Sequence, residues 1–433
     1  MAKAKLILVP SAKMDSNKKE DRNEHGLIRM SAAARKNMGF EESVEVFPDT
    51  KSTEKRMKSS MMLDIFKAFA GDIKALKAQE DYSVADMQRV GFVTTKTFRK
   101  ITGARSTAPK KNIWISNDVH DTVIGADPEF LLFDAHGDVI RANNVMAYTG
   151  QLGCDGAMAE VRPKPAITPE GLTANIRSIF ANKSLTEKIK KYKWMAGCYY
   201  RDNTRDYPMG GHIHIGNPAK LANIELKERS HIFKAMNKII DELLAIPLIK
   251  IDGAELGRKW RTECKMGKYG YFGEWRPCNG RLEHRTLSGM WLMHPRLAEC
   301  VFGTAKAIID EIFHLLANKN FSVAYALPKK YQNASIWSRD FDHWDKSPLA
   351  KAMGCTKSAR EMVEWLHTSS AANITPAYMR RWRSHMQTLS TYNTYSQYID
   401  GLFEILKQNT KAFHDYDKEL KKNWLSSRKF IGE

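Results

Sequence analysis

The sequence predicts an α+β protein whose sheet is largely antiparallel. Short segments that alternate apolar and polar residues indicate strands, and amphipathic helices lie between them in irregular order. The 433 residues are 43% hydrophobic, which suffices for two or three domains with cores of their own. The sequence contains no internal repeat, P-loop or Gly-x-Gly-x-x-Gly motif, so any nucleotide must be bound in another way.

Residues 1–110 are expected to form a small, β-rich N-terminal domain. The predicted strands are Leu6–Pro10, Leu27–Met30 and Ser43–Pro48. Between the last two, Ser31 caps a short helix that ends near Gly39. This order of strand, helix, glycine and strand resembles the repeat of small swapped-hairpin and double-psi barrels, so an α/β or barrel-like domain is expected. The polar and basic segment Ser106–Lys111 is the predicted linker.

Residues 111–318 form the predicted core domain, and residues 319–433 form a mostly helical C-terminal region. In the core, Thr168 is a favourable N-cap and Pro169 a favourable first residue for a helix that runs to Ala181. Apolar residues at helical spacing predict two further core helices, Leu226–Leu244 and one that begins at Pro295. The predicted C-terminal helices are Thr356–His367, Thr375–Leu389 and Tyr395–Lys422.

The segment Gly210–Gly216, with the sequence Gly-Gly-His-Ile-His-Ile-Gly, carries two histidines at a spacing of two. Side chains alternate between the two faces of a strand, so His212 and His214 share one face while the isoleucines face a core. The flanking glycines allow a backbone or a ligand to approach closely. The two imidazoles are therefore expected on a functional face of the sheet.

Three other predicted strands carry polar residues at the same spacing. The pairs are Asp127 and Glu129 in Ile124–Phe133, Glu160 and Arg162 in Asp155–Pro163, and Glu283 and Arg285 in Arg281–Leu287, with Arg281 in phase. In the last strand, Leu282 and His284 are expected on the opposite face. For each pair alone, the alternative is a solvated face of an antiparallel sheet, but such faces usually carry Lys, Thr and Ser.

A sheet face that gathers these side chains requires cations. Carboxylates about 4 Å apart repel by roughly 4 kcal/mol per pair at an effective dielectric constant near 20. Oxygen ligands together with one or two imidazoles suit Mg²⁺ or Mn²⁺, and the remaining arginines suit phosphate. The four pairs therefore predict a metal site that also binds an anion.

The net charge of +19 fits three classes of partner: nucleic acid, an acidic protein surface, or anionic small substrates. Lysines and arginines are spread along the chain and no nucleic-acid motif is present, which favours solubility or the steering of anions. The six cysteines lack Cys-x-x-Cys spacing and are expected to be reduced thiols in the cytoplasm. Neither a signal peptide nor a long apolar segment is found, so no membrane association is expected.

The four motifs resemble those of the glutamine synthetase superfamily. Gly-Gly-His-Ile-His resembles its Gly-x-Gly-x-His-x-His strand, and Gly-Ala-Asp-Pro-Glu-Phe resembles its first strand, Gly-x-Glu-x-Glu-Phe. Arg-Leu-Glu-His-Arg resembles its Arg-x-Glu-x-Arg strand, which is followed in both by a proline-led helix. The order is the same, and the branch that the chain resembles is the carboxylate–amine ligases (amidoligases) of tailed phages. Over residues 120–315 the resemblance implies a curved antiparallel sheet with flanking helices.

The resemblance also implies two groups of metal ligands. Glu129 and Glu160 resemble ligands of one Mg²⁺. Asp127, His212 and Glu283 resemble those of a second ion beside the ATP phosphates. Two departures from the superfamily pattern leave the number of ions open: an aspartate stands at position 127 in place of a glutamate, and the second strand keeps one carboxylate unless Asp155 supplies another.

Amide formation in two steps is the activity that the resemblance implies. A carboxylate attacks the γ-phosphate of ATP to give an acyl phosphate, and an amine then displaces phosphate. Arg285 resembles the arginine that neutralises the transferred phosphoryl group. The implied catalytic residues are Arg285, Arg162, Glu160 and Arg281, and those implied to bind the nucleotide are His212, His214, Arg285, Arg258 and Arg261. Arg258 and Arg261 are also candidates for a clamp on the acceptor carboxylate, or for plain surface arginines.

The implied substrates are a small-molecule or peptide carboxylate and an amine, with ATP and Mg²⁺ or Mn²⁺ as cofactors, in the host cytoplasm if a phage encodes the chain. An oligomer is compatible with the resemblance. Two alternatives stay open from the sequence. One is a metal-dependent hydrolase that uses His212 and His214 as zinc ligands. The other is a basic protein associated with nucleic acid or a virion, which keeps the fold without activity.

Overall fold

A computed structural model describes residues 7–10, 90–93, 112–252, 270–271, 273–278, 280–328, 347–369, 371–408, 413, 417–426 and 428–430. The chain divides into two compact units, Met1–Lys111 and Asn112–Glu433. In the first unit, β1(Ile7–Pro10) pairs in parallel with β2(Val90–Val93). The other elements predicted for residues 1–110 lie outside the described residues. How the chain divides into functional domains stays a prediction.

The first sheet of the second unit is built around β12(Ile213–Pro218). Two strands flank it in antiparallel orientation, β4(Ile124–Ala126) and β14(Arg281–His284), and β13(Trp275–Cys278) pairs with β14. The short strand β3(Ile115–Ser116) runs parallel to the end of β12. In this register His214 lies opposite Glu283 on one side and Gly125 on the other. Direct partners share a face, so His214 and Glu283 are neighbours.

The second sheet places β5(Glu129–Phe133) at its centre. Its other strands are β6(Val139–Ile140), β7(Leu152–Asp155), β8(Met158–Val161) and β9(Lys193–Ala196), all antiparallel to their neighbours. Glu129 lies directly opposite Glu160. Two like charges at directly opposed positions repel, so this face needs a proton or a cation between them.

The prediction that Asp127 and Glu129 share one face of a single strand is wrong. The chain passes from β4 to β5 at Asp127 and Pro128, and a proline has no N–H to donate to a ladder. The two sheets nevertheless stay joined, because the N–H groups of Asp127 and Glu129 donate to the carbonyls of His212 and Gly210, at 3.3 and 2.9 Å. The result is one curled, largely antiparallel surface, and the predicted α+β class is confirmed.

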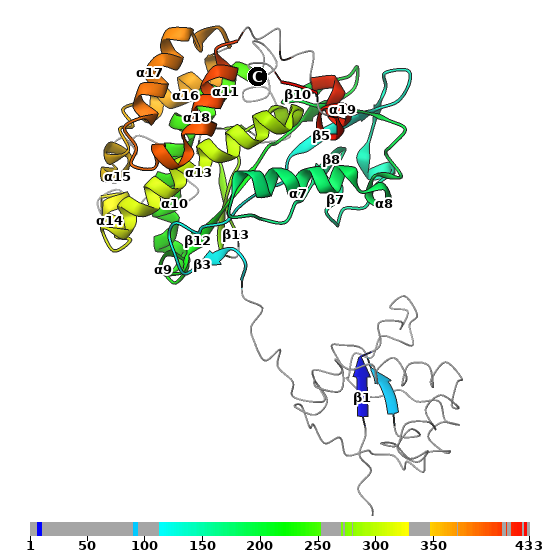
Figure 1. Ribbon diagram of the computed structural model, residues 1–433, viewed down its shortest axis with the longest axis horizontal. Helices are drawn as coiled ribbons and strands as arrows, with labels where there is room; N and C mark the ends of the chain where they lie inside the picture. The colour runs from blue at the N-terminus through cyan, green and yellow to red at the C-terminus, as the bar shows by residue number, and fades with distance from the viewer. Residues whose placement is uncertain are drawn as a thin grey trace, which may run out of the picture. The chain divides into compact units, whose positions relative to one another are not determined.

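Three long helical segments cover this surface and follow the predicted positions (Figure 1). Helix α7(Pro169–Ala181) begins where Thr168 accepts a hydrogen bond from the N–H of Gly171. Helix α10(Leu226–Ile240) continues through a π-helical turn, η3(Asp241–Ala245), into α11(Ile246–Asp252). The third is α13(Pro295–Ala317). Phe130 of β5 packs against Phe180 of α7 at 5.9 Å between ring centroids, so this helix covers the face opposite Glu129.

The C-terminal helices pack against these elements. They are α15(Pro348–Ala352), α16(Ala359–Thr368), α17(Pro376–Met386), α18(Tyr392–Leu406) and α19(Leu420–Leu425). Trp424 donates to the carbonyl of Leu292 at 2.6 Å. One predicted helix, Tyr395–Lys422, is wrong, because α18 ends at Leu406, where its apolar spacing stops.

Shorter elements complete the described chain. They are η2(Ala142–Asn144), α8(Lys183–Thr186), β10(Tyr199–Arg201), β11(Asp206–Pro208), α9(Ala219–Ala222), η4(Gly289–Met293), α14(Val323–Ala326), η7(Ala371–Asn373) and η9(Asp417–Glu419). Strands β10 and β11 form an antiparallel hairpin. Within the described ranges, no helix has both the length and the apolar character needed to cross a membrane.

Candidate active site

Asp127, His212 and Glu283 meet at the join between the two sheets. Each offers a ligand atom, and the three atoms lie within 4.8 Å of one another. His212 Nδ1 lies 3.3 Å from Asp127 Oδ1 and 3.6 Å from Glu283 Oε1. Both of these oxygens are buried, and neither accepts a well-aligned hydrogen bond. Two carboxylate oxygens and an imidazole nitrogen in such a group are a suitable ligand set for Mg²⁺ or Mn²⁺.

The charge of Asp127 is favoured by its two histidine neighbours. Burial raises the pKa of this carboxyl, but His214 and His212 more than offset the effect and hold the pKa well below its usual range. Asp127 is therefore a carboxylate at neutral pH, as a metal ligand must be.

His214 lies beside this group but both of its ring nitrogens are engaged by protein atoms. Nδ1 accepts from Arg281 Nε at 3.0 Å, and Nε2 lies 2.9 Å from Asp127 Oδ2. An arginine can only donate, so Nδ1 carries no proton and Nε2 donates to Asp127. The guanidinium of Arg281 also lies 4.6 Å from the ring centroid of Trp114. His214 therefore orients Asp127, and Arg281 fixes the tautomer and the ring position of His214.

Three side chains hold Glu283, which is fully buried. Arg276 Nε and Nη2 both lie 2.8 Å from Oε2, and Arg285 Nε lies 3.3 Å from Oε1. Cys278 donates its thiol to Oε2 at 3.5 Å. Burial raises the pKa of this thiol and the charge of Glu283 raises it further, so the sulfur keeps its proton. Oε2 is thus occupied by protein donors, while Oε1 faces His212 and Arg285.

Glu129 and Glu160 form the second carboxylate group, on β5 and β8. Glu129 accepts the N–H of Gly210 at 2.6 Å. Burial raises its pKa well above the usual range, and the charges of Asp155 and Asp127 add to this effect. Glu160 pairs with Arg162, which also donates to the carbonyl of Cys154 at 3.1 Å. Burial thus favours the protonated form of Glu129, while Arg162 compensates the charge of Glu160.

The close approach of backbone to the histidine strand depends on Gly211. A Cβ atom at this position would lie 2.0 Å from the carbonyl oxygen of Ser288. The N–H of Gly211 also donates to the carbonyl of Leu287 at 2.8 Å. Only glycine fits here, which explains its place directly before His212.

His284 lies on the opposite face of β14, as its position in the strand predicts. It is fully buried, and its Nε2 lies 2.7 Å from Asp241 Oδ1 in the π-helical turn η3. Asp241 Oδ2 accepts the N–H of Gly273 at 2.8 Å. This contact joins the strand to the helix behind the sheet, away from Glu283.

The residues singled out from the sequence fall into three sets. Asp127, His212, His214, Glu283, Arg285 and Arg281 are brought together at the join between the sheets, and Glu129, Glu160 and Arg162 lie on the adjoining β5 and β8. Arg258 and Arg261 lie outside the described residues. The sequence reasoning missed Arg276, Cys278 and Trp114. The alternation Trp-Arg-Pro-Cys before a glycine turn was the available signal for Arg276 and Cys278.

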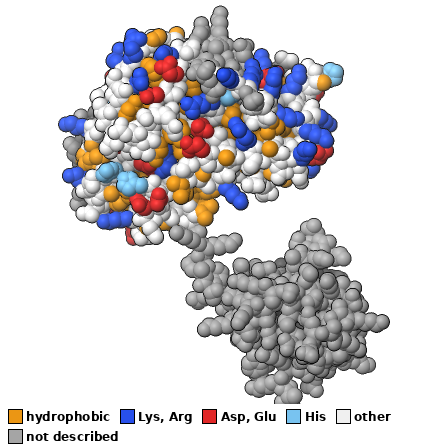
Figure 2. All heavy atoms as spheres, viewed as in Figure 1, with side chains coloured by type: hydrophobic (Ala, Val, Ile, Leu, Met, Phe, Trp, Pro, Cys, Tyr) orange, Lys and Arg blue, Asp and Glu red, His pale blue; other side chains and the backbone are white. Residues whose placement is uncertain are grey.

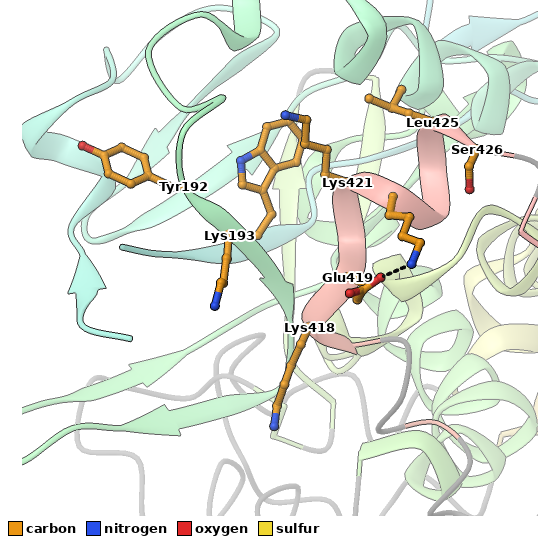
Figure 3. Close-up of a pocket in the computed structure, with 9 residues that line it drawn as sticks. Tyr192, Lys193, Lys418, Glu419, Lys421, Leu425 and Ser426 are labelled. Carbon is orange, nitrogen blue, oxygen red and sulfur yellow. Dashed lines mark ion pairs between the residues drawn. The ribbon is translucent and has the colours of Figure 1, made fainter. Parts of the chain in front are cut away.

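Basic side chains are spread over the described surface (Figure 2). One hollow of about 430 Å³ gathers several of them, between β9, η9 and α19 (Figure 3). Lys193, Lys418 and Lys421 line it, and Lys421 Nζ lies 5.6 Å from the ring centroid of Trp194. A neighbouring lysine, Lys422, pairs with Glu419 at 3.0 Å. None of the residues that line this hollow belongs to the two carboxylate groups.

Comparison with known proteins agrees with the motifs. Residues 124–339 match the family described as phage phiEco32-like COOH.NH2 ligase-type 2. No curated protein matches the sequence. Among solved structures, a bifunctional glutathione synthetase from Pasteurella multocida is similar, with 12% sequence identity and a TM-score of 0.32. That alignment covers 71% of this chain and 56% of the other, so the chain spans less than two thirds of that protein.

The family match covers every motif on which the resemblance to carboxylate–amine ligases was based. Through residues 124–339 the chain belongs to the phage phiEco32-like COOH–NH2 ligase family, whose description agrees with the carbon–nitrogen ligation predicted from the sequence.

Proposed function

We propose that the protein joins a carboxylate to an amine by using ATP and Mg²⁺, and that an acyl phosphate is the intermediate. The observation that carries this proposal is the group formed by Asp127, His212 and Glu283, which shares its sheet face with Arg285. A buried group of this kind binds a divalent cation, and the neighbouring arginine suits an anionic phosphoryl group. The family supplies the reaction class, and the site supplies the means to handle ATP without a P-loop.

Asp127, His212 and Glu283 are the residues that would hold one Mg²⁺. The fit is supported by Asp127 Oδ1 and Glu283 Oε1, two buried acceptor atoms without well-aligned donors. Glu129 and Glu160 would hold a second ion, and this ion would favour the charged form of Glu129 against the raised pKa of that carboxyl, because a metal ligand must be deprotonated. Bound Mg²⁺ would offset negative charge on the phosphoryl group during its transfer.

The protein side chains around this centre have separate tasks in the proposed reaction. The charge of Arg285 acts on both carboxylate groups, because its Nε lies 3.3 Å from Glu283 and its charge lowers the pKa of Glu129. This position between the groups suits neutralisation of the γ-phosphoryl group. Arg276 holds Glu283 in place, and Arg281 holds His214. Arg162 compensates Glu160, and no direct contact with a substrate is needed for that role.

The proposed reaction has two steps. A carboxylate oxygen of the acid attacks the γ-phosphorus of ATP, and the bond between that phosphorus and the bridging oxygen breaks to release ADP. The amine nitrogen then attacks the acyl carbon, loses a proton, and expels inorganic phosphate. The buried surroundings of the site protect the acyl phosphate from water. We also propose that the curled sheet is glutamine-synthetase-like, on the strength of the motif order alone.

The two alternatives differ from this proposal in features of the site. A zinc hydrolase with a His-x-His ligand pair needs both imidazoles, yet each ring nitrogen of His214 faces a protein partner. A nucleic-acid partner would use basic surface such as the hollow lined by Lys193, Lys418 and Lys421 (Figure 3). That alternative requires polyanion binding that weakens steeply with salt and no turnover of ATP.

Titration calorimetry of ATP binding with and without Mg²⁺ tests the proposed function. We expect binding to require Mg²⁺, and we expect Asp127→Asn to weaken it by at least about 10-fold, because a metal ligand is lost. Lys418→Gln removes one charge at the hollow in Figure 3 and should leave ATP binding unchanged. Absence of Mg²⁺-dependent binding at millimolar ATP would contradict the proposal. So would tightly bound zinc together with hydrolysis that needs no ATP.

A further inference from the structure

A hollow of about 570 Å³ lies between the β7–β8 turn and the β10–β11 hairpin. Its volume is in the range of sites for small ligands. Three guanidinium groups line it, from Arg141, Arg201 and Arg205, together with the carboxylates of Asp155 and Asp206. Because arginines outnumber carboxylates in its lining, the hollow suits an anionic ligand.

The three arginines of this hollow differ in whether they have a carboxylate partner in the protein. Arg201 Nε lies 3.5 Å from Asp206 Oδ1, which also accepts the hydroxyl of Tyr199 at 2.5 Å. Among the described residues, Arg141 and Arg205 form no ion pair within 4.0 Å. The Nε of Arg141 is buried and has no acceptor. A buried donor without a protein acceptor gains free energy from a ligand that supplies one, so Arg141 is suited to bind an anion.

The hollow shares a sheet face with Glu160 of the second carboxylate group. Met158 lines it, and Glu160 follows two residues later on β8, so both side chains lie on one face, about 7 Å apart along the strand. Tyr207 and Met209 of the hairpin pack on this same face with Met158. Asp155 lines the hollow too, and its charge acts on Glu129. The hollow and the carboxylate pair therefore lie on one face of the second sheet.

The catalytic centre and the hollow would bind two different anionic groups of the same substrate. The reacting carboxylate must lie at the metal groups and Arg285, if the proposed function holds. The three arginines of the hollow belong to neither carboxylate group, so they address a different negative group. A planar guanidinium binds a carboxylate, as it binds a phosphate, with two parallel hydrogen bonds.

We infer that the hollow lined by Arg141, Arg201 and Arg205 binds the acid substrate, and that this acid carries a second carboxylate beside the one that reacts. This inference rests on the proposed function for the identity of the reacting group. The second carboxylate is bound in the hollow, away from the carboxylate that reacts. The class of substrate is thus a dicarboxylic acid or a peptide with a second acidic group.

The test compares diacids with monoacids of matched length in calorimetry on the full chain. Glutarate, adipate and suberate are titrated against valerate, hexanoate and octanoate, and Mg·ATP binding is measured separately on each protein. We expect at least one diacid to bind about 10- to 100-fold more tightly than its monoacid, as for hydrogen bonds between charged groups. Arg205→Gln and Arg141→Gln should each remove most of this preference. Lys418→Gln, which removes a charge elsewhere, should keep it.

Each outcome decides for or against the inference. Equal binding of diacids and monoacids would overturn it, as would a preference that survives both arginine changes. It would also be overturned if Arg205→Gln weakened Mg·ATP binding and left the diacids unaffected, since the hollow would then serve the nucleotide. Because Arg205 is exposed, its change tests the inference even if Arg141→Gln does not fold. A diacid preference without Mg·ATP binding would support the hollow and contradict the proposed function, so the two failures are distinguishable.

Discussion

Glu283→Gln is expected to lower turnover by at least about 100-fold and to weaken Mg²⁺-dependent ATP binding as well. The change keeps the shape of the side chain and removes a negative charge from the three-ligand group. Loss of a residue that merely supports a ligand costs about 10- to 100-fold, so loss of a ligand itself should cost at least as much. Arg276 would still find an acceptor in the amide oxygen, so the fold should survive. Initial-rate kinetics and ATP titrations with varied Mg²⁺ measure both effects.

Two changes serve as controls for Glu283→Gln. Glu311 is another buried carboxylate, in α13, where it accepts from Ser390 at 2.6 Å, and Glu311→Gln should leave turnover unchanged. His284 lies next to Glu283 in sequence but faces Asp241, and His284→Gln keeps a donor toward that carboxylate. Its Mg·ATP binding should match that of the unchanged protein. An inactive but folded His284→Gln protein beside an active Glu283→Gln protein would show that the wrong strand face was chosen.

Arg285→Lys is expected to lower turnover by roughly 10²- to 10³-fold while ATP affinity changes little. Lysine keeps the positive charge and can still pair with Glu283, but it loses the planar fork that binds two phosphate oxygens. If the fork acts mainly on the transferring phosphoryl group, the loss appears in kcat and not in the dissociation constant of ATP.

Arg276→Lys is the matched control for Arg285→Lys, because both arginines contact Glu283. Arg276 is proposed to position this carboxylate, so its change should raise the Mg²⁺ concentration needed for half-maximal activity and affect kcat less at saturating Mg²⁺. Full activity of Arg285→Lys would reduce Arg285 to a structural ion pair. If Arg276→Lys and Arg285→Lys lowered kcat equally at saturating Mg²⁺, the separate roles proposed for the two arginines would be contradicted.

The helices that begin with strong local signals are the elements that the sequence predicts well. Thr168 and Pro169 fix the start of α7, and Pro295 fixes the start of α13, because caps and N-terminal prolines act within one helical turn. The end of α18 at Leu406 was missed, since the polar residues after it still have adequate helical propensity. Local propensity does not reveal where packing against α13 stops.

The faces of strands were also predictable, but their partners were not. Alternation places His212 and His214 on one face and His284 on the other, and the structure agrees. Alternation cannot reveal that the chain changes sheets at Pro128, which sends Asp127 to the His212 group and Glu129 to Glu160. Likewise, the donor that reaches Nδ1 of His214 comes from a strand that is distant in the sequence. The contact between Arg281 and His214, 67 residues apart, is of this kind.

The most direct test of the central claim follows oxygen from the acid into phosphate. The acid of the series that best supports amine-dependent ADP release is labelled with ¹⁸O in its carboxylates and incubated with ATP, Mg²⁺ and hydroxylamine as the amine. The account predicts one ¹⁸O atom in each inorganic phosphate released, together with an equal amount of hydroxamate, because the carboxylate oxygen attacks the γ-phosphorus. Unlabelled phosphate released at the same rate as ADP would mean that water is the nucleophile, and an acyl-phosphate ligase would be contradicted.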